Sequence, residues 1–294
     1  MVRELSGHEI DALHYELLVK DIVSAAEKLP PFPDIAWRVI SLVKAMAPVR
    51  EIEKLIGYDQ ALTAKILRLA NCAYYGRRYS VGSLKDAILL LGDKRLIQSV
   101  MAACAKTYYV RGGSQDEREL WEHSVAAALI SEIAARRLRY NKIFTLYTAA
   151  LLHDIGKTIL DVYSKIYLQS SLREIRGESD TVRAERRALG IDHQELGGII
   201  AGKWKFTGDI KAAIAYHHNP QAAGQYEEIT SLVYLADLLA VSFAGKNEEQ
   251  PGRGVDPASN PILRKFGITG KMIDDFRNEV EIDMAEIVNA LGMS

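Results

Sequence analysis

The sequence of 294 residues predicts an all-α protein. Apolar residues recur at spacings of three and four along almost the whole chain, which is the pattern of helices with one buried face. Alternation with a period of two, which is typical of half-buried strands, does not last beyond a few residues. Hydrophobic residues make up 48% of the chain, which is enough apolar material for one large core or two ordinary ones.

Prolines and capping residues delimit the first predicted helices. The segment 29–33 (LPPFP) is expected to end the first helix, because proline lacks a backbone N–H and clashes with the preceding turn. Asp34 is expected to cap the next helix through its side-chain oxygen. Further on, Ser83 and Asp86 resemble a capping box, and the short apolar helix that they begin is expected to end at Gly92.

Two loops divide the rest of the chain. The segment 111–116 has two adjacent glycines followed by residues that cap helices, so a new helix is expected after it. We place a boundary there, between an N-terminal helical subdomain (1–112) and a second helical subdomain (113–294). The segment 245–260 is rich in glycine and proline and is expected to be an exposed loop before two closing helices.

Composition limits the partners and the cellular location. The formal net charge is −1 and no strongly basic segment stands out, so direct binding of duplex DNA is not expected. Cys72 and Cys104 are the only cysteines, which excludes a disulfide-rich secreted scaffold and a cysteine-based zinc site. The first twenty residues lack the apolar core of a signal peptide, and the weakly charged stretch 229–245 is shorter than the ~20 residues that span a bilayer. We therefore expect a cytoplasmic protein that does not enter a membrane.

Histidine and aspartate residues are the strongest functional signal. A lone histidine in an apolar helix is more often a hydrogen-bonded core residue than a ligand, but five such histidines together favour a metal site. They are His123, His153, His193, His217 and His218. Asp154 directly follows the second of them, and Asp237 lies in an apolar helix, where a buried carboxylate needs a partner. Imidazoles combined with a carboxylate that can bridge two ions are what a binuclear metal site requires.

The segment 149–157 (AALLHDIGK) is the strongest local motif. Its apolar run predicts a buried helix, Gly156 permits a turn after the His-Asp pair, and Lys157 can face a phosphate or an acid. Four residues before His123, Glu119 lies on the same helical face and can reach a metal, although a solvated surface glutamate is the favoured interpretation.

Further motifs complete a pattern that extends over most of the chain. In order they are residues 29–33, 59–63, 68–73, 83–88, 91–92, 121–124, 151–157, 193–197, Trp204 and 215–218. Their order and spacing resemble the HDOD family, the HD-related output domains of bacterial signalling proteins, with the module at roughly residues 20–240. The resemblance implies an N-terminal helical subdomain packed on an HD-like helical subdomain.

The resemblance also implies a ligand set. Metal-dependent phosphohydrolases of the wider HD superfamily hold an ion with a first histidine, the His-Asp pair and a later aspartate. By motif these are His123, His153, Asp154 and Asp237. The related HD-GYP phosphodiesterases add three histidines for a second ion, and the matching residues are His193, His217 and His218. Asp154 would be shared by both ions; iron or manganese suits such ligands, with zinc and nickel as alternatives.

Two functions follow from the resemblance. The first is a regulatory output module that binds metal and acts through contacts with signalling proteins or with a nucleotide or phosphate ligand. The second is a metal-dependent phosphohydrolase acting on a nucleotide or cyclic dinucleotide, in which Lys157 would be catalytic by assisting electrostatically. Many HDOD proteins are thought to have lost catalysis, and residues 219–221 replace the glutamate and Gly-Tyr-Pro loop of the HD-GYP group. We therefore favour the regulatory module.

Overall fold

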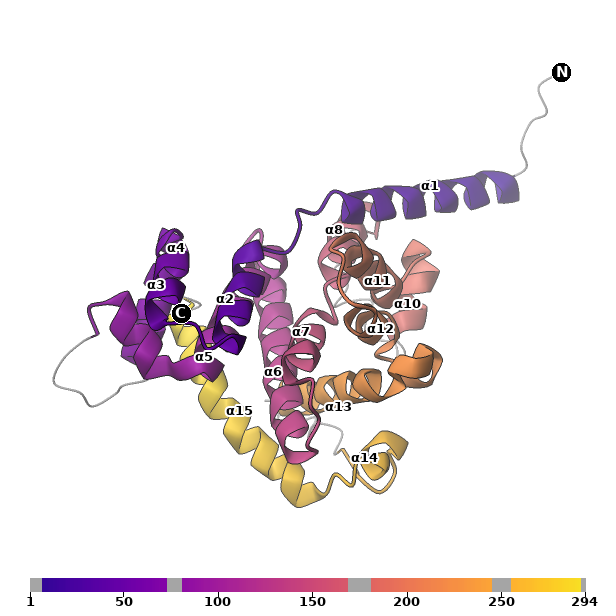
Figure 1. Cartoon of the computed structure of the whole chain (residues 1–294). Coiled ribbons are helices and arrows are strands. Elements are labelled where there is room, and N and C mark those ends of the chain that lie inside the picture. Colours follow the sequence, from indigo (N-terminus) through magenta and orange to yellow (C-terminus); the bar gives the residue numbers. More distant parts are fainter. Residues whose placement is uncertain (1–6, 73–80, 169–180, 245–254, 292–294) are drawn as a thin grey trace.

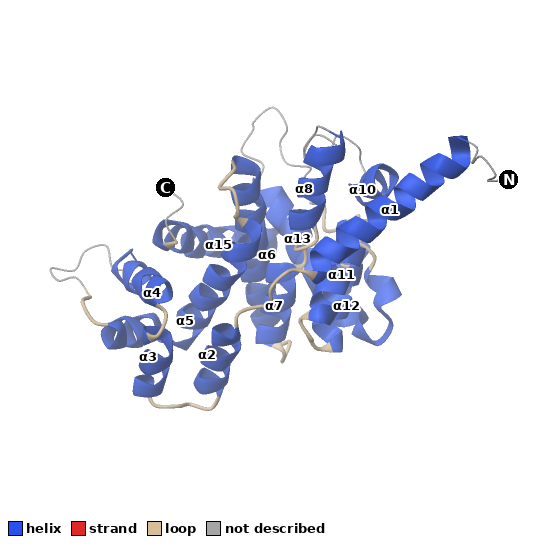
Figure 2. Ribbon diagram, turned by 90° about the horizontal axis from the view of Figure 1, so that it is seen from above, coloured by secondary structure: helices blue, strands red, loops and turns tan. Residues whose placement is uncertain are grey.

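The structure is a computed structural model that describes residues 7–72, 81–168, 181–244 and 255–291. Every regular element within these residues is a helix, so the prediction of an all-α fold is confirmed (Figure 1 and Figure 2). The predicted loop at 245–260 falls largely on residues outside this description. No helix among the described residues is both long and apolar enough to span a membrane.

The first five helices precede the double glycine. They are α1 (Gly7–Glu27), α2 (Asp34–Lys44), α3 (Val49–Gly57), α4 (Gln60–Cys72) and α5 (Leu84–Tyr109). The break at the prolines is confirmed, but the prediction that Asp34 caps α2 is wrong. Pro33 occupies the cap position with no side-chain hydrogen bond, and Asp34 is the first helical residue. There its negative charge is still favourable, because the N-terminus of a helix carries partial positive charge.

Helix α5 contains both the confirmed cap and a revised end. The Ser83 hydroxyl accepts a hydrogen bond from the Asp86 backbone N–H at 3.0 Å. Gly92 does interrupt the helix, with φ of +66°, a conformation that glycine adopts without steric cost. The helix resumes directly after this kink, so Gly92 redirects the chain instead of ending the element.

The second half supplies the remaining helices. They are α6 (Gln115–Arg137), α7 (Ile143–Leu152), α8 (Lys157–Leu168), α10 (Thr181–Leu189), α11 (His193–Lys203), α12 (Gly208–Tyr216), the 3-10 helix η1 (Pro220–Tyr226), α13 (Glu227–Ala244), α14 (Pro261–Lys265) and α15 (Gly270–Ala290). Helix α6 lies in the middle of the molecule and packs against α7, α13 and α15 (Figure 2). Ser114 and Glu117 form a complete capping box at its start, as expected for a helix after the double glycine.

The first and last long helices each pack against the other half of the chain. Helix α1 packs against α8, α10 and α11 of the second half, and α15 returns along α6 to pack against α4 of the first (Figure 1). One continuous core, from Ile22 to Leu291, joins both halves. The boundary at residues 112 and 113 stays a prediction.

An aromatic cluster joins the halves around segment 29–33. It consists of Phe32, Trp37, Tyr108, Trp204 and Phe206, whose ring centroids lie 4.9 to 6.2 Å apart in the contacting pairs. The Trp204 indole N–H donates to the carbonyl of Pro30 at 2.9 Å. The Tyr108 hydroxyl donates to the carbonyl of Pro31 at 2.7 Å. Because this segment is not helical, its carbonyls need such partners, and the two bonds fix it against the end of α11.

Candidate metal centre

The His-Asp pair sits in a tight turn between two helices. Helix α7 ends at Leu152, His153 and Asp154 follow, and α8 begins at Lys157. This turn lies directly against the start of α11, where a Cβ on Gly156 would come within 2.2 Å of the His193 carbonyl oxygen. A side chain there is excluded, so Gly156 is what allows the His-Asp turn and His193 to come together.

Four helices bring the other predicted ligands to this turn. His193 is the first residue of α11, whose N-cap Asp192 accepts a hydrogen bond from the Glu195 N–H at 2.9 Å. His217 and His218 directly follow the last residue of α12. The two remaining ligands lie inside helices, His123 in α6 and Asp237 in α13.

The first donor group consists of His123, His153, Asp154 and Asp237. Its Nε2 atoms on His123 and His153 are 3.3 Å apart. The Asp237 Oδ1 atom is 3.0 Å from Nε2 of His123 and 3.5 Å from Nε2 of His153. Asp154 Oδ2 lies 3.4 Å from Nε2 of His153. Separations of this size are those between neighbouring ligands around one ion that is about 2.1 Å from each.

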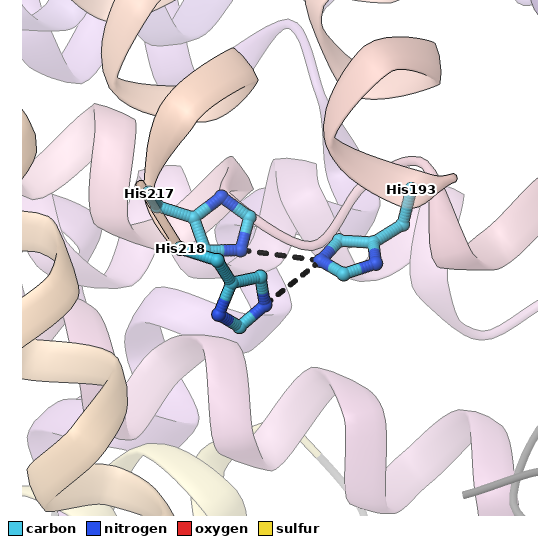
Figure 3. A group of neighbouring side chains, drawn as sticks. All are labelled: His193, His217 and His218. Atoms are coloured by element: carbon cyan, nitrogen blue, oxygen red, sulfur yellow. Dashed lines mark hydrogen bonds between the residues drawn. The ribbon is translucent and has the colours of Figure 1, made fainter. Parts of the chain in front are cut away.

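The second donor group consists of His193, His217 and His218, whose rings turn toward one another (Figure 3). Nε2 of His193 lies 3.2 Å from Nε2 of His217 and 3.2 Å from Nε2 of His218. The other carboxylate oxygen of Asp154, Oδ1, is 3.5 Å from Nε2 of His193 and 3.8 Å from Nε2 of His217. Asp154 therefore directs one oxygen to each donor group, as a bridging carboxylate does.

Hydrogen bonds on the far side of three rings decide which nitrogen faces the centre. Nδ1 of His153 lies 2.7 Å from the Ala150 carbonyl oxygen, and Nδ1 of His217 lies 2.8 Å from that of Ile214. Nδ1 of His193 lies 2.6 Å from a carboxylate oxygen of Glu185. Because these partners only accept, each Nδ1 carries a proton, and each ring in its neutral form presents the lone pair of Nε2 to the centre. Facing lone pairs repel one another unless a cation or a proton lies between them.

Charge at the centre also favours a cation. Burial alone would raise the pKa of Asp154 and of Asp237, but His153 and the other nearby cationic groups hold both pKa values well below the usual range. Burial disfavours the charged ring of His153, yet attraction by Asp154 and Asp237 outweighs it and raises its pKa to about 10. Burial holds the pKa of His193 and His217 well below the usual value. Without metal, the centre therefore combines two carboxylates with a protonated His153 and with neutral rings of His193 and His217.

The residues present fit a divalent transition metal. Asp154 is fully buried, and its Oδ1 atom accepts no hydrogen bond from any described residue. A buried carboxylate oxygen without a partner is costly, and a metal ion is a partner that would satisfy it. Nitrogen and carboxylate ligands together suit iron, manganese, zinc or nickel.

All seven predicted ligands are thus close together, while their role as metal ligands stays a prediction. Lys157 also lies in the centre, with its Nζ atom 2.6 Å from Asp154 Oδ2. Glu119 is exposed and accepts a hydrogen bond from the Gln115 amide at 3.1 Å, which agrees with the surface interpretation. Glu185 was missed, because a glutamate followed by two arginines in a predicted helix has the pattern of a solvated face.

Comparisons with known proteins agree with this architecture. A family model described as the HDOD domain matches residues 29–220. An HDOD domain protein with unknown function from Geobacter sulfurreducens is 22% identical with a TM-score of 0.67, covering 95% of this chain and 99% of that one. A protein from Shewanella amazonensis SB2B, assigned provisionally to the phosphohydrolases, is 21% identical with a TM-score of 0.65, covering 92% and 98%.

Two more matches differ in length from this chain. A protein from Marinobacter aquaeolei VT8, assigned provisionally to signal transduction, has a TM-score of 0.68 at 19% identity, covering 95% of this chain and 65% of that one. An uncharacterized protein of Treponema pallidum (strain Nichols) is 21% identical over 229 residues, which are 73% of this chain. The chain spans 43% of the length of that curated relative. At these identities, the similarity to the solved structures shows the fold.

Proposed function

The chain belongs to the HDOD family, and from this premise we propose that it is a metal-binding regulatory module of bacterial signal transduction. The observation that carries the proposal is the convergence of six further histidine and aspartate side chains, from five helices or their ends, around the buried Asp154 carboxylate. Such a set of buried charges and lone pairs is unfavourable on its own and becomes favourable around a cation.

In this proposal the first donor group holds one ion and the second holds another, with Asp154 between them. Iron or manganese is the expected metal, with zinc or nickel as alternatives. The module would act through contacts with signalling proteins, or with a nucleotide or phosphate ligand. It would act in the cytoplasm. Lys157, whose Nζ atom pairs with Asp154, would neutralise that carboxylate in part.

Helix packing connects the metal centre to the contact between the two halves of the molecule. The ligands of the two groups lie on α6, α11 and α13 and at the ends of α7 and α12, so bound metal would link these elements. Helix α11 begins at His193 and is capped at its other end by Trp204, which contacts segment 29–33. A change at the metal would therefore act on the contact between the two halves of the molecule.

Metal-dependent phosphohydrolysis is the second candidate, and the access to the site favours it. The His218 side chain is 33% exposed and that of His123 is 17% exposed, so one edge of the centre faces solvent. Bound ions would supply Lewis-acid activation of water and of phosphoryl oxygens. Lys157, on the wall of the same centre, would then attract and orient an anionic phosphoryl group.

Elemental analysis of the purified protein tests the metal proposal. We expect about two moles of transition metal per chain, lost in Asp154→Ala and reduced in His217→Ala, because these variants remove the shared and the second-group ligand. The control is Glu119→Gln, an exposed carboxylate one turn from His123, which should keep the wild-type metal content. Wild-type protein that is free of metal and takes up no added iron, manganese, zinc or nickel would refute the proposal.

A substrate screen with the metal-loaded protein separates the two functions. Hydrolysis of phosphodiester or nucleotide substrates that disappears in Lys157→Ala would establish the enzyme. Metal binding without hydrolysis of any of these substrates supports the regulatory module.

A further inference from the structure

Glu185 has the geometry of a residue that positions a metal ligand. It lies in α10 with only 1% of its surface exposed, among the most buried charged residues of the described chain. Its Oε2 atom is 2.6 Å from Nδ1 of His193 and also accepts a hydrogen bond from the His193 backbone N–H at 2.9 Å. One carboxylate oxygen thus fixes both the ring and the main chain of the same histidine.

The position of His193 in its helix explains why a side chain is needed there. His153 and His217 each follow the C-terminus of a helix, and their Nδ1 atoms bond to the carbonyl three residues earlier. His193 is instead the first residue of α11, where the backbone offers free N–H groups and no helical carbonyl. An acceptor for its Nδ1–H must therefore come from another element, and α10 supplies it.

Contacts on both sides hold α10 against the metal centre. Arg186, next to Glu185, forms ion pairs with Asp192 at 2.5 Å and with Glu195 at 3.2 Å, and both of these lie at the start of α11. The Tyr15 hydroxyl of α1 lies 2.6 Å from the carbonyl oxygens of Arg186 and Arg187. These contacts fix the carboxylate of Glu185 relative to His193.

We propose that Glu185 is the positioning residue of the second donor group. It keeps the proton of His193 on Nδ1 and the ring plane directed so that Nε2 faces His217 and His218. A carboxylate behind a ligating imidazole also makes its other nitrogen a stronger donor. The inference deepens the proposed function and rests on it, since it assigns to a residue outside the ligand set control over the second ion.

The test uses the full chain with two substitutions and one control. Glu185→Ala removes the acceptor, and Glu185→Gln keeps the shape and one acceptor oxygen but not the charge. The control, Glu119→Gln, changes an exposed glutamate of α6. Metal affinity is measured by calorimetric titration of metal-free protein with manganese and with zinc. The tautomer of His193 is read in metal-free protein by NMR of ¹⁵N-labelled histidine.

We expect the second ion to bind roughly 10–100-fold more weakly in Glu185→Ala, with a smaller loss in Glu185→Gln and no loss in the control. The first ion should bind as in wild type, because Glu185 bonds to His193, which is a ligand of the second donor group. In metal-free protein, His193 should carry its proton on Nδ1 in wild type and populate both tautomers in Glu185→Ala.

Wild-type tautomer and wild-type affinity in a folded Glu185→Ala variant would overturn the inference, as would an equal loss of both ions. If Glu185→Ala does not fold, Glu185→Gln decides the question through affinity, and a second ion bound as tightly as in wild type would overturn the inference. Metal-free wild type that binds no metal would refute the proposed function, whereas the tautomer comparison would still measure what Glu185 does to His193.

Discussion

Replacing Gly156 with alanine tests whether the approach of the His-Asp turn to α11 assembles the metal centre. The added Cβ would lie 2.2 Å from the His193 carbonyl oxygen and 3.0 Å from the Gly197 backbone nitrogen. An ordinary carbon-to-oxygen contact is about 3.3 Å, so the turn and α11 must separate by about 1 Å. Both neighbours are backbone atoms, so no side chain can rotate away to relieve the contact.

This displacement has two measurable consequences. Overpacking of a buried site costs about 1–3 kcal/mol, and a clash with backbone atoms belongs at the upper end, so the free energy of unfolding should fall by about 3 kcal/mol. For a domain of this size that lowers Tm by roughly 5–10 °C. Metal sites tolerate displacements of about 0.5 Å, so a shift of His193 against Asp154 should weaken the second ion at least tenfold.

Urea unfolding of metal-free protein and calorimetric titration with metal measure the two effects separately. Gly57→Ala is the matched control, because Gly57 ends α3, is exposed and has no atom within 4 Å of the position that a Cβ would take. That change should leave metal binding as in wild type and alter stability by less than about 1 kcal/mol. If Gly156→Ala unfolds at the wild-type urea concentration and binds metal as tightly, the close approach does not assemble the centre.

Three further predictions concern thiols, the aromatic cluster and pH. Cys104 is buried, and burial raises the pKa of its thiol to about 12. An aromatic disulfide reagent should therefore react only with the partly exposed Cys72 until the protein is unfolded. Rapid reaction of two thiols in native protein would contradict this. Trp204→Phe keeps a ring but loses the hydrogen bond to Pro30, and should lower the free energy of unfolding by about 1 kcal/mol or more in a urea titration; no change would mean that this bond is not stabilising. Metal-free protein should be most stable near pH 6.5, the usual pKa of histidine. Below that pH stability should fall, because the buried histidines of the second donor group take up protons only when the protein unfolds. Above it stability should also fall, because the folded state loses the proton of His153 as pH rises toward about 10. Urea midpoints that change in one direction only across this range would refute the assignment.

Local patterns predicted the helices well because helix formation depends on neighbours in sequence. The spacing of apolar residues gave the helical class, the prolines at 29–33 gave the first break, and Ser83 gave a cap that the structure contains. The errors are also local. Asp34 was expected at the cap, but Pro33 with its fixed φ occupies that position, and Gly92 bends α5 without ending it.

The metal centre was predictable in membership but not in geometry. The His-Asp pair is one segment, whereas the histidines of the second donor group come from the start of α11 and the end of α12. Only their order along the chain, as a family pattern, connected them. Glu185 had no such signal, because its burial results from the packing of α10 against α8, α1 and α11.

Glycine at position 156 shows the same limit in another form. The sequence suggested that it permits a turn, and glycine is usually required in turns for a positive φ. Its φ is not positive here, and the requirement comes instead from His193, which lies 37 residues further along the chain. A contact between distant segments cannot be deduced from the local pattern around either of them.

The orientation of the helices gives the centre a preference for cations that the side chains alone do not explain. Helices α7 and α12 both end at the site, with His153 and His217 at their C-caps, so their partial negative charges point toward it. Helices α8 and α11 begin there and would contribute the opposite sign. The first N–H groups of α8 donate to carbonyls of the turn before it, while Glu185 accepts from the first N–H of α11 and Asp192 caps that helix. Backbone and carboxylates therefore act together against a free anion. We expect a phosphate or nucleotide ligand to bind at this centre only after metal has bound.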